Sequence, residues 1–256
     1  RSEMCIRDRR HPYGGELVFT AFSGSHQDAI NKGLDALAQE VRPGANNTEV
    51  SWEELQDTTW EVPYLPIDPK DVGRDYQAVI RVNSQSGKGG VAYIMKTDHG
   101  INMPRAMQAE FSSVVQAVTD AEGGEVNSKN MWDIFANEFL ERTSPLELVT
   151  FQVDNSTTED EDAKVTATIV FNGEKRIISG MGNGPIAAYA NALEDVGIDF
   201  EVIDYSQQSR TAGDDAEAAC YIAAEVNGAQ VWGAGIAGST TRASINAITS
   251  AVNRAD

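Results

Sequence analysis

The pattern of apolar and polar positions is clearest in the C-terminal third of the chain, where strand-like stretches precede a helical one. Residues 165–171 are rich in β-branched side chains and are followed by Asn172-Gly173, a pair that favours a two-residue hairpin turn. A return stretch at 175–179 leads to a glycine-rich corner. Pro185 suits the first turn of the helix that follows, which has one apolar face made of Ile186, Ala190 and Leu193.

The same pattern occurs again at a constant offset. Asn172-Gly173 recurs as Asn227-Gly228, Gly180 as Gly235, and Asn191 as Asn246. Ser239 can cap the second helix, whose apolar stripe is Ile245, Ile248 and Val252. With further strands at 147–153 and 200–205, the pattern predicts an α+β domain over 147–256. It consists of two βββα-type repeats, 147–198 and 200–256.

The N-terminal part reads as helices and linkers. Residues 1–9 show no periodicity, and we expect an extraneous leader there. Residues 10–82 form a first unit with a helix from about His26, a capping box of Ser51 and Glu54, and a strap at 60–69 that three prolines make rigid. The apolar stripe of that helix is Ile30, Leu34, Leu37 and Val41.

A stretch at 83–90 lacks the spacing of a phosphate loop, so no nucleotide site is expected there. Its five polar residues and three glycines predict a hinge instead. Residues 91–146 then form a helical unit, with one helix from Pro104 and another from about Ser128. These two helices are expected to pack as a hairpin across Gly123-Gly124.

Composition and charge exclude several classes of partner and site. The 256 residues carry a formal charge of −19, which argues against nucleic acid or an anionic membrane as a partner. The histidines, His11, His26 and His99, do not lie at metal-ligand spacing, so no metal site is expected in this chain. Two cysteines cannot build a disulfide framework, and we expect a cytoplasmic protein.

Two side chains are candidates for chemistry. His26 lies at a predicted helix N-terminus, where an imidazole can act in proton transfer, but a lone histidine is also common near helix caps. Tyr64 lies in the strap, which could fix its hydroxyl or simply use the ring for packing. The corner Gly182-Asn183-Gly184 can present N–H groups to a carboxylate or phosphate, or only let the chain turn sharply.

Three motifs in order closely resemble the long, actinobacterial type of 2-isopropylmalate synthase. They are Phe22-Ser23-Gly24-Ser25-His26-Gln27-Asp28-Ala29-Ile30, Val62-Pro63-Tyr64-Leu65-Pro66-Ile67-Asp68-Pro69 and Val82-Asn83-Ser84-Gln85-Ser86-Gly87-Lys88-Gly89-Gly90. The duplicated domain resembles that family's leucine-sensing regulatory domain. The resemblance covers the family's C-terminal half, so we expect the catalytic TIM barrel to be absent from this chain.

The resemblance implies an enzyme that condenses acetyl-CoA with 3-methyl-2-oxobutanoate and is inhibited by leucine. It implies a homodimer in which His26 and Tyr64 reach the partner's active site, and a divalent metal, zinc or magnesium, in the missing barrel. The fragment alone is then expected to be inactive. Two alternatives stay open: a stand-alone amino-acid-binding module, and a sister enzyme such as citramalate synthase, whose sensor would prefer isoleucine.

The resemblance also implies a leucine site. Its polar part would be the corner together with Asp214, although Asp214 can equally belong to a solvated turn. Ser209 stands where the resemblance implies a small apolar residue, and this departure is expected to lower the affinity for leucine. The implied leucine-binding residues are Gly182, Asn183, Gly184, Ile186, Val202, Tyr205, Ala212, Asp214 and Ala216.

Overall fold

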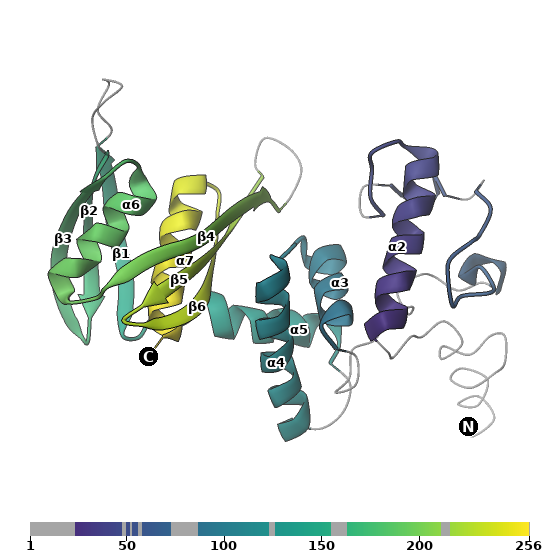
Figure 1. The fold of residues 1–256 in the computed structure, drawn as a ribbon, viewed down its shortest axis with the longest axis horizontal. Coiled ribbons are helices and arrows are strands. Elements are labelled where there is room, and N and C mark those ends of the chain that lie inside the picture. The colour runs from purple at the N-terminus through teal and green to yellow at the C-terminus, as the bar shows by residue number, and fades with distance from the viewer. Residues whose placement is uncertain are drawn as a thin grey trace. The chain divides into compact units, whose positions relative to one another are not determined.

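The chain forms two compact units, residues 1–132 and 133–256, in a computed structural model (Figure 1). The residues described are 24–47, 50–51, 53–55, 58–72, 87–122, 126–154, 163–210 and 216–255. The predicted leader, residues 83–86 of the predicted hinge, the Gly123-Gly124 turn, and the site residues Ala212 and Asp214 lie outside these ranges. Each unit is described by itself.

The described part of the first unit is helical. Its elements are α2 (Gly24–Val41), the short 3₁₀ helix η2 (Pro69–Val72), α3 (Gly87–His99), α4 (Arg105–Glu122) and the first part of α5 (Ser128–Phe135). The predicted stripe on α2 is confirmed at Ile30, Leu34 and Leu37, which are buried. The Ser51–Glu54 capping box is also present. The Ser51 backbone N–H donates to Glu54 Oε2 (2.7 Å), and the Glu54 N–H donates to Ser51 Oγ (3.4 Å).

The helix α3 departs from the sequence-based prediction. Gly87 to Gly90 form its first turn instead of belonging to a hinge. The apolar side chains of Val91, Ile94 and Met95 are buried, and this tertiary burial outweighs the low helix propensity of the glycines. The α3 helix contacts both α2 and α4, so α4 packs beside α3, where an α4–α5 hairpin was predicted.

The second unit contains two three-stranded antiparallel sheets, each followed by a helix (Figure 1). The first sheet has the order β1-β2-β3 and the second β4-β5-β6. The elements are β1 (Leu146–Asp154), β2 (Ala163–Phe171), β3 (Glu174–Gly182), α6 (Pro185–Ala192), η5 (Leu193–Val196), β4 (Phe200–Ser209), β5 (Ala218–Val226), β6 (Ala229–Ala237) and α7 (Thr240–Arg254).

The two halves of this unit share the same turn conformation, the same kind of backbone cap and the same kind of strand irregularity. Asn172 and Asn227 have φ of 51° and 49°, the left-handed conformation that Asn-Gly hairpins require. On the last strand of each half, a backbone N–H is capped from the helical segment: Ser179 N by Asp195 Oδ2 (3.1 Å) and Ala234 N by Ser250 Oγ (3.3 Å). The first strand of each half also contains a register shift, at 148/150 and at 202/204.

The helices lie directly on the strands because glycines leave room for them. A Cβ at Gly180 would lie 2.2 Å from Ala188 O, and one at Gly235 would lie 2.1 Å from Ala243 O. One core cluster of buried side chains, among them Ile169, Tyr189 and Ile248, joins both halves.

The unit begins earlier than the predicted boundary at 147. The π-helical turn η4 (Ala136–Leu140) belongs to it, since Ser250 Oγ donates to Phe139 O (2.6 Å). Asn253 also donates to Arg142 O (2.7 Å) and accepts from Leu146 N (2.8 Å). These bonds tie the segment that enters the sheet to the last helix.

Candidate functional site

The structure brings His26 and Tyr64 together in the first unit. Their ring centroids lie 4.0 Å apart with an interplanar angle of 24°, which is a stacked arrangement. His26 comes from the first turn of α2, and Tyr64 comes from the strap. Both side chains are exposed, Tyr64 by 61%, so a substrate or another protein surface can reach them.

A tight turn presents Tyr64. The backbone N–H of Leu65 donates to Val62 O (3.3 Å), Pro63 occupies the second turn position, and Tyr64 has a φ of 64° in the third. This is the pattern of a type II turn, in which glycine normally takes the position with positive φ. A bulky residue there is a strained outlier of the kind that clusters at functional sites.

An imidazole stacked on a phenol can hold and pass a proton, and both groups can hydrogen-bond a carbonyl or hydroxyl oxygen. Among the described residues, no group of three or more histidine, cysteine or acidic side chains could hold a metal ion. The described residues therefore offer no fit for the divalent metal, which the resemblance implies for the barrel. Nor does any helix of the described part combine the length and apolar character needed to cross a membrane.

The predicted leucine-binding residues lie in the second unit. Gly184 is the N-cap of α6, so no side chain caps the first N–H groups of the helix from this position, and Pro185 occupies the predicted first turn. A Cβ at Gly182 would lie 2.7 Å from Ala188 N, whereas one at Gly184 would meet nothing within 4 Å. Close packing of α6 therefore explains Gly182, and it leaves Gly184 without a packing role.

The apolar members of the predicted site meet the same core. Ile186 and Val202 are both half-buried and pack against the core cluster. The Tyr205 hydroxyl donates to Gln207 Oε1 (2.5 Å) and lies 3.2 Å from Ser244 Oγ of α7. Burial raises the pKa of Tyr205, and the bond to Ser244 opposes that shift. Asn183 is exposed and Ala216 is half-buried.

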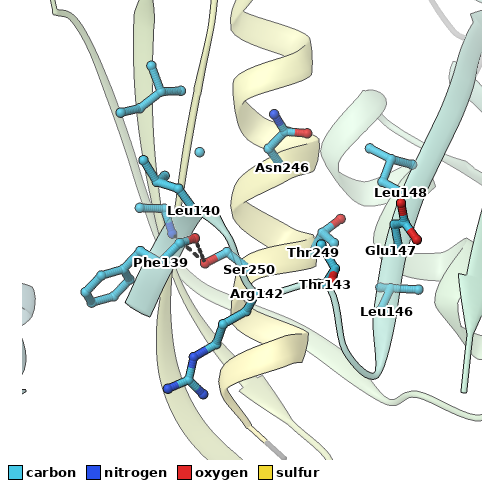
Figure 2. A pocket seen from close by; sticks show the side chains of 13 residues that line it. Phe139, Leu140, Arg142, Thr143, Leu146, Glu147, Leu148, Asn246, Thr249 and Ser250 are labelled. Carbon is cyan, nitrogen blue, oxygen red and sulfur yellow. Dashed lines mark hydrogen bonds between the residues drawn. The ribbon is translucent and has the colours of Figure 1, made fainter. Parts of the chain in front are cut away.

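Figure 2 shows a cavity that the sequence did not predict. It has a volume of about 280 Å³ and lies between η4, the start of β1, the end of β6 and α7. None of the predicted site residues lines it. The sequence pairs Asn246 with Asn191 only as repeat counterparts. In the structure Asn191 donates to Met181 O (2.8 Å), whereas Asn246 lines this cavity.

Two family models match the chain. One describes an alpha-isopropylmalate synthase, post-catalytic domain-like, over residues 16–96, and the other the LeuA allosteric (dimerisation) domain over residues 125–255. A 2-isopropylmalate synthase of Corynebacterium efficiens is 73% identical over 246 residues, which cover 96% of this chain and 42% of the relative. The relative so named in Corynebacterium glutamicum ATCC 13032 is 72% identical, covering 96% and 40%. That of Mycobacterium leprae is 53% identical over 256 residues, covering 99% and 41%.

The chain belongs to the 2-isopropylmalate synthase family. The resemblance drawn from its motifs is thereby confirmed. The chain spans about two fifths of the length of the curated relatives it matches. The His26–Tyr64 pair lies within the post-catalytic match, and both sheets lie within the allosteric match, which begins at residue 125, before the predicted boundary.

Proposed function

We propose that this chain is the post-catalytic and regulatory part of a 2-isopropylmalate synthase, which condenses acetyl-CoA with 3-methyl-2-oxobutanoate and is inhibited by leucine. In a homodimer, His26 and Tyr64 would reach the active site of the partner's barrel and move a proton during the condensation. The single observation that supports this role most directly is the exposed stack of the two rings, 4.0 Å apart, on a strained turn. The divalent metal would be held by the barrel.

The test is made in the full-length enzyme that contains this chain. His26→Ala and Tyr64→Phe should each lower kcat by about 10²–10⁴-fold, the usual contribution of a positioned proton-transfer group, with little change in KM. Tyr93→Phe is the matched control, because it removes the phenol hydroxyl of a half-buried tyrosine in α3 of the same unit. Near-wild-type kcat in both test variants would overturn the catalytic assignment.

We also infer that residues 147–198 and 200–256 arose by duplication. The repeated strand order, the paired Asn-Gly turns and the paired N–H caps of Ser179 and Ala234 support this inference. Duplication alone does not create a binding site, but it lets one half differ from the other. Gly184 shows such a difference, since its counterpart at the start of α7 is Ser239.

The regulatory proposal is that leucine binds near Gly184. Its carboxylate would meet the first N–H groups of α6, and its side chain would meet Ile186, Val202 and Tyr205, with the residues 212–216 completing the site. Asp214 would supply an acceptor for the ammonium group. The match to the allosteric (dimerisation) domain supports a dimer. In that dimer, leucine binding would alter how His26 and Tyr64 are presented to the partner's barrel.

Titration calorimetry of the whole chain with leucine checks the regulatory proposal. Micromolar affinity is expected, about −7 to −8 kcal/mol. Gly184→Val should weaken binding strongly, because a branched side chain would crowd the ligand and not the fold. Gly238→Val is the control, since a Cβ there also meets nothing within 4 Å at the corner before α7.

The calorimetry also separates the alternatives. Heat from isoleucine without heat from leucine would favour a sister enzyme such as citramalate synthase. Leucine binding by the chain, combined with wild-type turnover in the His26 and Tyr64 variants of the full-length enzyme, would favour a chain that binds the amino acid and takes no part in catalysis. No heat from either amino acid would contradict the regulatory proposal.

A further inference from the structure

The conformation of Tyr64 has to be held by its surroundings. With a φ of 64°, the residue lies in a region that disfavours bulky side chains, and its ring is 61% exposed, so burial of the ring contributes little. A strained residue of this kind persists only where neighbouring contacts fix the backbone around it.

Two anchors fix the ends of the turn. Val62 and Leu65, which flank Pro63 and Tyr64, are 5% and 3% exposed. Trp60 adds a bond from outside the turn, since its indole Nε1–H donates to Leu65 O at 2.7 Å. That carbonyl belongs to the peptide between Leu65 and Pro66, so the indole fixes the backbone one residue beyond the strained Tyr64.

A third contact fixes the N-terminal side of the turn. Gly33 lies seven residues after His26, and this spacing places both on one face of α2. A Cβ at Gly33 would lie 2.5 Å from Pro63 Cδ and 3.4 Å from Val62 Cα. The turn therefore rests against α2 at a point where only glycine leaves room, on the face that also carries His26.

We propose that Trp60 and Gly33 are positioning residues for the proposed reaction. Trp60 holds the carbonyl of Leu65 at the end of the turn, and Gly33 sets how closely Pro63 approaches α2. Together they hold the phenol over the imidazole of His26 before substrate arrives. This proposal rests on the proposed catalytic function of His26 and Tyr64.

The experiment uses Trp60→Phe and Gly33→Ala in the full-length enzyme. Phenylalanine keeps an aromatic ring and loses the donor to Leu65 O, while alanine pushes Pro63 outward. Each change should lower kcat by about 10- to 100-fold with KM within roughly twofold, as expected when a reacting group is misplaced by about 1 Å. Trp132→Phe, a half-buried tryptophan of the first unit stacked on His99, is the control and should keep wild-type kcat.

Two readouts exclude a role in stability alone. Gly33→Ala should lower the melting temperature less than its loss of kcat would require, because the higher helix propensity of alanine offsets part of the cost of the contact with Pro63. In the Tyr64→Phe background, Trp60→Phe should cause almost no further loss of kcat, because the group it positions has been removed. An additive loss in that double variant, or a fall in folded fraction that accounts for the lost kcat, would overturn the positioning role.

The failure of this inference is distinct from the failure of the catalytic proposal. If His26→Ala and Tyr64→Phe lower kcat while Trp60→Phe and Gly33→Ala keep wild-type values, only the positioning role is wrong. If His26→Ala and Tyr64→Phe themselves keep wild-type kcat, the catalytic assignment is wrong and the positioning role falls with it. A rescue variant offers a positive check, because Pro63→Ala removes the Cδ that Gly33→Ala would meet. In the Pro63→Ala background, adding Gly33→Ala should therefore lower kcat by less than it does in the parent enzyme.

Discussion

Replacing Gly235 by alanine should destabilise the second unit strongly, because it adds a methyl group where the helix α7 lies directly on β6. The new Cβ would lie 2.1 Å from Ala243 O and 2.6 Å from Ala247 N, both backbone atoms of α7. Reaching an ordinary contact of about 3.4 Å requires the helix to move by roughly 1.3 Å, since backbone cannot rotate away as a side chain can.

The cost follows from what α7 buries. Ile245, Ile248 and Val252 are at most 4% exposed, so lifting the helix opens contacts along the core cluster. Overpacking a well-packed core costs about 1–3 kcal/mol and occasionally more, and a clash with backbone belongs at the upper end, so we expect about 2–4 kcal/mol. For a unit of this size, that lowers the melting temperature by roughly 10 °C.

Thermal unfolding of the whole chain, followed by calorimetry and far-UV circular dichroism, measures the effect. Gly238→Ala is the matched control: it makes the same chemical change three residues along, where the Cβ would meet nothing within 4 Å, and it should melt within about 2 °C of the parent chain. If Gly235→Ala melts as Gly238→Ala does, α7 does not lie against β6 as described, and the packing argument for the paired glycines is refuted.

Three further outcomes are expected from unfolding experiments in denaturant. Asn253→Ala should lower the free energy of unfolding by about 2–3 kcal/mol, because it leaves Leu146 N, Leu146 O and Arg142 O without their buried partner. Asn246→Ala on the same helix is the control and should change that free energy by less than about 0.5 kcal/mol. Equal losses in the two variants would contradict the role of Asn253. Burial raises the pKa of Tyr189 from 10.0 to about 12, so the unfolded chain ionises first as pH rises. The stability that the protonated Tyr189 contributes is complete below pH 10 and is lost between pH 10 and 12. Tyr189→Phe should therefore make the free energy of unfolding fall less steeply over that range, and an unchanged slope would contradict the burial of this phenol. At the strained turn, Tyr64→Gly should be more stable than Tyr64→Ala by about 0.5–1 kcal/mol, the reverse of the usual order, because alanine keeps a Cβ at positive φ.

The sequence determined the local elements of this protein well wherever the local signal was strong. The Asn-Gly turns at 172 and 227, the capping box of Ser51 and Glu54, and the helix that begins at Pro185 all follow from short-range backbone preferences, and the structure has each of them. The motifs around His26 and Tyr64 also pointed to the family, which the comparisons confirm.

Contacts between residues far apart in the chain were decided only by the tertiary structure. The glycines after residue 86 indicated a hinge by composition, yet burial of Val91 and Met95 makes them a helical turn. The unit boundary lies before residue 147 because Asn253 and Ser250, more than 100 residues later, bind the segment that precedes β1. His26 and Tyr64 lie in separate motifs, and only the fold stacks their rings, because Pro63 packs against α2 at Gly33. This contact joins segments that are distant in sequence, so no short-range pattern predicts it.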